Sequence, residues 1–376
     1  MCIKKCVRAV IFAAIVCVPE VSAQQDGPAA SARQESPAAS GQQGTPPAQP
    51  ASPSRQAAHG RMYLDVVVAP KSGVPVSGLE PQDFTLLDNK VPQTITSFEA
   101  LGGSRAPIEV ILVMDTINTG YEHVAYERDQ IDKFLRIDGG RLAHPTTLAI
   151  VTDTGSQMQE EFTNDGNELA TVLDQQTVAL RTIRRSAGFY GADERFQLSI
   201  SALSRLVAHE AQRPGRKLIF WLSPGWPYLS GPEVLLEEKQ ERQIFSDIVG
   251  LSTGLQQGHI TLYSIDPLGT EDVSGRTFYY EAFLKGVSKP SQAQLGNLAL
   301  QVLATQSGGL VLYSSNDTSG LLQKCLADTQ SYYEISFEPQ VSRGPDEYHH
   351  LEIRLAKHGL TARTRQGYYA QPIPAN

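Results

Sequence analysis

The stretch Glu109-Val-Ile-Leu-Val-Met-Asp-Thr-Ile-Asn-Thr119 decides the fold class of this chain. It is a continuous apolar run that ends in a carboxylate, Asp115, and is followed by polar residues and Gly120. Strands that are apolar on both faces are typical of parallel sheets covered by helices on both sides. In such sheets, ligands bind just beyond the carboxyl ends of the strands. We therefore expect Asp115 to lie at the ligand-binding edge of a parallel sheet.

Residues 107–330 alternate apolar strands with amphipathic helices, which is typical of a doubly wound, Rossmann-like α/β domain with a mainly parallel sheet. Strands are expected at Val110–Asp115, Thr147–Thr152, Lys217–Ser223, Ile260–Asp266 and Gly309–Tyr313, with a more polar edge strand at Gln157–Phe162. Helices are expected at Glu122–Arg136, Asn167–Gln175, Phe196–Glu210, Pro232–Gly250, Gln292–Gln306 and Thr318–Thr329. In the first helix, the inward stripe is Val124, Ile131, Phe134 and Leu135.

Short strands flank this domain on both sides. Residues 60–100 contain strands separated by turns and show no helical period, and residues 331–370 again alternate apolar and polar side chains. The first of these segments is too small to be stable alone. We predict that the two segments pair in one small antiparallel, sandwich-like β unit, with two separate β extensions as the alternative. The pair His349-His350 is expected at the surface.

The N-terminus is typical of a signal peptide over residues 1–23. Lys4, Lys5 and Arg8 precede an apolar core at Ala9–Val18, and Val21-Ser-Ala23 matches a cleavage site. The core is shorter than the roughly 20 apolar residues that span a bilayer. We expect cleavage after Ala23 and a periplasmic or secreted protein, with a retained anchor as the alternative. Residues 24–58 lack Val, Ile, Leu and aromatic residues, which predicts a disordered tether rich in Pro, Ala, Gln and Ser.

Composition and motifs exclude several functions. The formal net charge is −8 and there is no basic cluster, which argues against nucleic acid as a partner. Three of the four cysteines lie within residues 1–23, so Cys325 alone remains after cleavage and is expected to be a buried apolar residue. The sequence has no Gly-rich phosphate loop, no zinc-protease helix and no Gly-x-Ser-x-Gly elbow.

Several motifs in order resemble those of the von Willebrand factor A-related proteins of the acidobacterial type. They are Gly73-Val-Pro-Val-Ser-Gly-Leu-Glu-Pro-Gln-Asp-Phe84, Leu87-Asp-Asn-Lys-Val-Pro-Gln93, Pro214-Gly-Arg-Lys-Leu-Ile-Phe-Trp-Leu-Ser-Pro-Gly-Trp-Pro227, Tyr332-Tyr-Glu-Ile-Ser-Phe-Glu-Pro339 and Arg363-Thr-Arg-Gln-Gly-Tyr-Tyr369. The resemblance covers nearly everything after the tether. It implies a von Willebrand factor A fold, whose members are often exported and without a defined biochemical role.

The resemblance also implies a metal-ion-dependent adhesion site for Mg²⁺ or Mn²⁺. Such sites use Asp-x-Ser-x-Ser after the first strand, a Thr from a second loop and an Asp from a third. Here Asp115 and Thr119 keep oxygens, but Ile117 replaces a hydroxyl and Pro224 replaces the aspartate. Asn118, Ser223, and Asp193 or Glu194 in the second loop could compensate, because a hard cation takes neutral oxygen ligands. The alternative is that Asp115 accepts backbone N–H bonds and holds no metal.

The same edge is the predicted docking surface. Trp226, Pro227 and Tyr228 follow the central strand and would form an aromatic patch if they were exposed, whereas Trp226 could instead pack beneath its loop. We expect an exported, non-enzymatic adhesion module that binds a protein or peptide through Asp115, Asn118, Thr119, Ser223, Trp226, Tyr228 and Asp193. The alternatives are a hydrolase that uses carboxylates of this edge, such as Asp153 and Asp266, and a structural protein of envelope assembly.

Overall fold

The apolar run that ends at Asp115 forms β5 (Ile108–Asp115), which lies inside a mostly parallel sheet. The sheet has the order β11-β10-β9-β5-β6-β7, and β8 also pairs with β6. Parallel pairing joins β11 (Val311–Leu312), β10 (Ile260–Ile265), β9 (Arg216–Leu222), β5 and β6 (Arg141–Thr152). The short strands β7 (Gly155–Met158) and β8 (Thr163–Asp165) are antiparallel to β6. The fold is therefore mixed α/β.

The computed structural model describes residues 60–71, 73–103, 106–176, 188–227, 236–268, 279–313, 315–340, 342 and 344–371. These residues belong to one compact unit, Pro53–Asn376. The expected signal peptide and tether lie outside the described residues, as does Tyr228. No helix in the described ranges is long and apolar enough to cross a membrane.

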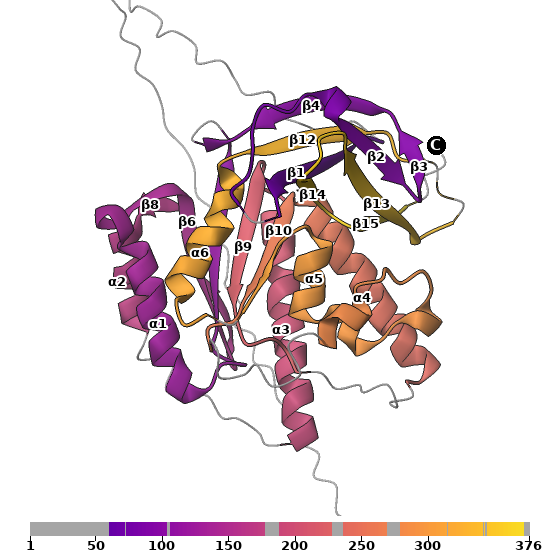
Figure 1. Cartoon of the computed structure of the whole chain (residues 1–376). Coiled ribbons are helices and arrows are strands. Elements are labelled where there is room, and N and C mark those ends of the chain that lie inside the picture. Colours follow the sequence, from indigo (N-terminus) through magenta and orange to yellow (C-terminus); the bar gives the residue numbers. More distant parts are fainter. Residues whose placement is uncertain are drawn as a thin grey trace, which may run out of the picture. The chain divides into compact units, whose positions relative to one another are not determined.

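Helices cover both faces of the parallel sheet (Figure 1). One face carries α1 (Tyr121–Leu135), α2 (Gly166–Gln176) and α6 (Thr318–Leu326), and the other carries α3 (Gly188–Glu210), α4 (Glu238–Gln257) and α5 (Leu300–Gln306). Alternate residues of β5 serve the two faces, as strand geometry requires. Ile111 and Val113 pack with α3–α5, whereas Val110, Leu112 and Met114 pack with α1, α2 and α6.

Two smaller antiparallel sheets combine strands from both ends of the chain, drawn in indigo and yellow in Figure 1. The first has the order β14-β1-β12-β4, with β1 (Met62–Pro70), β4 (Ile95–Leu101), β12 (Tyr332–Phe337) and β14 (Leu360–Arg363). The second has the order β15-β13-β2-β3, with β2 (Phe84–Asp88), β3 (Val91–Gln93), β13 (Glu347–Leu355) and β15 (Gly367–Ala370). Their facing apolar side chains, which include Leu64, Phe84 and Tyr333, form a shared core.

A buried carboxylate ties these strands to the α/β part. Asp328, just after α6, accepts the Tyr263 hydroxyl of β10 at 2.6 Å and is also bonded to Arg363 of β14. Arg216, at the start of β9, lies over the Tyr332 ring of β12 with 4.2 Å between the guanidinium carbon and the ring centroid. Hydrogen bonds to Asp328 and the cation–π contact of Arg216 therefore hold the C-terminal strands against the parallel sheet, in addition to apolar packing.

Several expectations on local structure were wrong. The edge strand expected at Gln157–Phe162 ends at Met158, as β7, and the helix expected over Phe196–Glu210 begins already at Gly188, as α3. The helix expected over Gln292–Gln306 begins only at Leu300, because its first half forms short 3-10 turns around Gly296, which packs against the Phe283 ring. Of the helix expected over Pro232–Gly250, the first residues, 232–235, lie outside the described residues; α4 begins at Glu238, where Glu237 and Gln240 form a capping box, and continues past Gly250 to Gln257. His349 is buried rather than exposed: its Nδ1 lies 2.8 Å from Asp88 Oδ1, and its ring stacks on Tyr368. Cys325 is buried, as expected.

Candidate functional site

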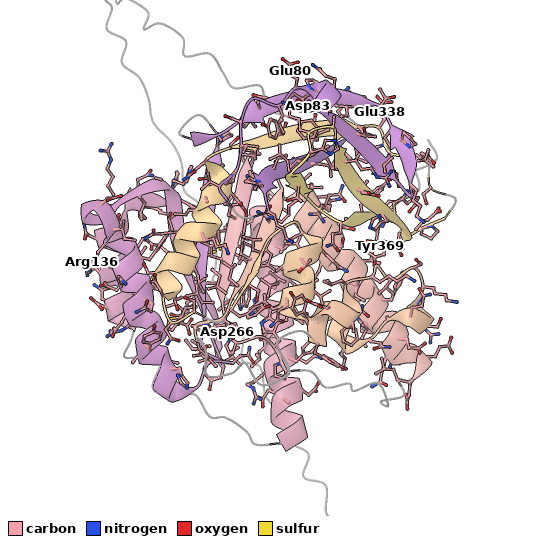
Figure 2. All side chains as sticks on the ribbon, viewed as in Figure 1. Glu80, Asp83, Arg136, Asp266, Glu338 and Tyr369 are labelled. Atoms are coloured by element: carbon pink, nitrogen blue, oxygen red, sulfur yellow. The ribbon has the colours of Figure 1, made fainter. Side chains whose placement is uncertain are left out.

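The loops after β5, β9 and β10 meet at the carboxyl edge of the parallel sheet. We call Asp115–Gly120, Ser223–Pro227 and Asp266–Leu268 together the strand-end rim. The strand register pairs Met114 with Leu222, and Leu222 with Ile265, so that the first residues of the three loops follow one another across the edge. Figure 2 labels Asp266 at this end of the sheet. The structure therefore brings Asp115 and Ser223 to neighbouring positions, as their places after parallel strands predicted.

Asp115 is fully buried, and its carboxylate accepts four N–H groups. The backbone N–H groups of Ile117 and Asn118 donate to Oδ1, each at 3.2 Å. The Asn118 side-chain amide donates to Oδ2 at 2.9 Å, and the indole N–H of Trp221 donates to the same oxygen at 3.1 Å. A carboxylate has about four lone-pair positions, so both oxygens are fully used. The backbone N–H bonds are those of the second sequence interpretation, and two side-chain donors, Asn118 and Trp221, add to them.

Two of the other predicted metal ligands, Asn118 and Ser223, have hydrogen-bond partners through their side chains. The Asn118 amide also donates to Ser199 Oγ of α3 at 2.9 Å, which ties the first rim loop to that helix. Thr119 is buried, and its backbone N–H donates to the Asp115 carbonyl at 3.3 Å, whereas its hydroxyl has no hydrogen-bond partner among the described residues. Ser223 is buried, and its hydroxyl accepts the Gly225 N–H at 3.1 Å. Asn118 and Ser223 thus stabilise the rim loops through their side chains, whereas Thr119 does so through its backbone.

The predicted aromatic patch is not formed by Trp226. Its side chain is only 2% exposed and meets the Trp221 ring edge to face, with centroids 5.4 Å apart and planes at 77°. Trp226 is therefore a core residue, so of the two alternatives left open by the sequence, the buried ring is the one found, and the tentative partner contact at Trp226 was wrong. Asp193 is half-buried on α3, six residues before Ser199, or about 9 Å along the helix at 1.5 Å per residue.

The residues present do not fit the Mg²⁺ or Mn²⁺ site that the resemblance implies. A hard cation needs several free oxygen ligands, and Mg²⁺ requires near-octahedral geometry. The oxygens of Asp115 already accept N–H groups, the Ile117 side chain is apolar and buried, and Pro224 offers no ligand. Within the described residues, no group of three or more His, Cys, Asp or Glu side chains is placed to hold a metal ion.

Sequence reasoning missed a buried acid under the rim, Glu127 of α1. Burial raises the pKa of its carboxyl well above the usual value, and the charges of Asp115 and Asp266 raise this pKa further. The nearby Thr119 hydroxyl partly offsets the increase in pKa, although the two side chains do not reach regular hydrogen-bond geometry. Position 127 lies three residues after Val124 and four before Ile131, so the helical spacing already placed Glu127 on the inward face of this helix.

Trp221 was the second residue that sequence reasoning missed. Its position in the apolar run Leu218–Leu222 predicts a buried ring, and a buried indole N–H usually has an acceptor. The need of a buried indole N–H for an acceptor was therefore the only indication of this hydrogen bond that the sequence offered. The identity of the acceptor depends on the pairing of β5 with β9, which places Val113 opposite Trp221.

No protein-family model matches the chain, and no curated protein matches it. Solved structures similar to it include proximal thread matrix protein 1 from the mussel byssus, with 9% identity, a TM-score of 0.36, and coverage of 64% of this chain and 51% of that one. The PilB minor pilin from Streptococcus sanguinis has 13% identity, a TM-score of 0.34, and coverage of 60% and 62%. The pilus adhesin SpaC from Lactobacillus rhamnosus GG has 9% identity, a TM-score of 0.33, and coverage of 80% and 50%. The chain thus spans less than two thirds of each of these structures, and likeness at this level assigns neither family nor function.

Proposed function

We propose that this chain is an exported, non-enzymatic binding module of the von Willebrand factor A type, and that a protein or peptide partner docks at the strand-end rim. The observation that carries the proposal is the hydrogen bonding around Asp115, which fixes the Ile117–Asn118 turn before any partner arrives. A loop already held in one geometry loses less conformational freedom on association. Binding residues are commonly placed on such loops above a rigid scaffold.

The position of the rim supports the same proposal. In open α/β sheets, ligands bind outside the carboxyl ends of the strands, where the three rim loops lie. Asn118, Pro224 and Leu268 are half-buried, so a partner can reach them, whereas Trp226 is covered. The proposed contact surface therefore consists of the half-buried residues of the three rim loops and excludes the Trp226 ring.

Photocrosslinking in the native envelope tests the proposal. A photoreactive residue is placed at Pro224 or at Leu268 in the full-length exported chain. Matched controls carry it at Gln212, just before β9, or at Arg141, which begins β6; both control side chains are exposed at the opposite end of the sheet. We expect one common protein adduct from both rim positions and from neither control position. Adducts of equal yield from all four positions, or from the controls alone, would overturn docking at the rim.

A further inference from the structure

We infer that the indole N–H of Trp221 and the N–H groups of the Ile117–Asn118 turn take the place of a cation on Asp115, so that hydrogen bonds alone hold this part of the rim in shape. The inference concerns the groups around one carboxylate and does not depend on a docking partner. It assigns to Trp221 the role of a positioning residue. The side chain reaches Asp115 from the neighbouring strand β9, whereas the other donors come from the loop that Asp115 begins.

The first step is the competition for the oxygens of Asp115. Hydrogen bonds to an ionised acceptor are the stronger kind, and this carboxylate accepts four of them. A cation bound to Oδ2 would displace the Trp221 or the Asn118 donor. The displaced indole N–H of Trp221 would then be buried without an acceptor, or the half-buried Asn118 amide would lose one of its two acceptors, and either loss is unfavourable.

The second step is that the side-chain donors are held in place. The Trp221 side chain is fully buried, and the ring of Trp226 packs against it edge to face at 5.4 Å. The Asn118 amide is fixed by its second bond, to Ser199 Oγ of α3. Neither donor can turn away without disturbing the core between the sheet and α3. The fixed donors therefore oppose metal binding in addition to the missing ligands at Ile117 and Pro224.

The experiment follows the indole N–H signals of the ¹⁵N-labelled full-length protein. The chain contains two tryptophans, so Trp226→Phe assigns both signals. Mn²⁺, which broadens signals of nearby protons, is added in millimolar excess. We expect both indole signals to keep their intensity as well as backbone amides at the opposite end of the sheet do, and the Trp221 signal to move in Asp115→Asn. Broadening of both indole signals and of the Ile117 and Asn118 amides but not of the amides at the opposite end, reversed by a chelator, would overturn the inference.

A restoring variant separates the two causes of metal exclusion. Ile117→Ser with Pro224→Asp supplies the hydroxyl and the carboxylate that the site lacks. We expect this variant to show no Mn²⁺ broadening at the Ile117–Asn118 turn until Trp221→Phe is added. Broadening before that addition would show that the hydrogen bonds do not exclude the metal. The measurement on the unaltered protein decides the inference by itself if these variants fail to fold.

Discussion

The indole nitrogen of Trp221 lies 3.1 Å from Oδ2 of Asp115, across two neighbouring strands of the parallel sheet. Trp221→Phe removes this bond and should lower the free energy of unfolding. The decrease should exceed the decrease caused by the smaller ring alone by about 2 kcal/mol, because the acceptor is charged. Trp226→Phe is the matched control. It removes the same atoms from a ring that is also buried, and its indole nitrogen has no hydrogen-bond partner among the described residues. Urea denaturation of both variants measures the difference, and equal losses would contradict a structural role for the bond.

Glu127→Gln should stabilise the protein, and the gain should depend on pH. Burial raises the pKa of this carboxyl in the folded protein well above 4.5, its ordinary value. The folded state therefore binds the proton more tightly than the unfolded chain, and the resulting stability is fully present only below the unfolded pKa. This contribution to stability is lost as the pH rises from about 4.5 through the folded pKa. The Glu127→Gln variant has no titrating group at this position, so it does not lose stability there over this range.

Unfolding measured at a series of pH values tests this prediction. The advantage of Glu127→Gln over the unaltered protein should grow as the pH rises above 4.5. Glu160→Gln, at an exposed position, is the control and should show no such growth. An advantage for Glu127→Gln that is constant across this range would show that the carboxyl is not held neutral in the folded state.

Tyr368→Phe should weaken the smaller antiparallel sheets. The Tyr368 hydroxyl donates to the buried carboxylate of Asp88 at 2.7 Å, and His349 Nδ1 lies 2.8 Å from the other oxygen. Loss of a donor to a buried charged group should cost about 2 kcal/mol of unfolding free energy. Tyr369→Phe removes a hydroxyl that donates to the neutral Val287 carbonyl at 3.0 Å and should cost about 1 kcal/mol. Chemical denaturation compares the two, and a larger loss for Tyr369→Phe would contradict this ranking.

Much of the α/β part could be predicted from local pattern. A run that is apolar on both faces and ends at Asp115 placed β5 correctly within a parallel sheet, because burial on both faces leaves few other arrangements. The strands at the two chain ends were visible as alternating segments, and they pair with each other. The sheet to which each strand belongs could not be read from sequence, since pairs such as β1 with β12 join residues far apart in the chain.

The candidate site was only partly predictable, for a physical reason. Sequence gives the residues that follow each strand, and so it placed Asp115 and Ser223 at one edge. It does not give the direction of a side chain within a loop, and so the exposure of Trp226 could not be decided. The Trp221 bond depends on the pairing of β5 with β9, and Glu127 interrupts a stripe that otherwise reads as apolar. Both are tertiary features with weak local signals.

Thermal melting of the unaltered protein with Mg²⁺, with Mn²⁺ and with a chelator tests most directly whether the rim at Asp115 is organised without metal. A ligand that binds only the folded state, at a hundred times its dissociation constant, would add about 2.7 kcal/mol to the free energy of unfolding and raise the melting temperature. We predict the same melting temperature under all three conditions. A rise with Mg²⁺ or Mn²⁺ that disappears in Asp115→Ala would contradict the account, because it would place a cation on the carboxylate that we assign to Trp221 and the loop N–H groups.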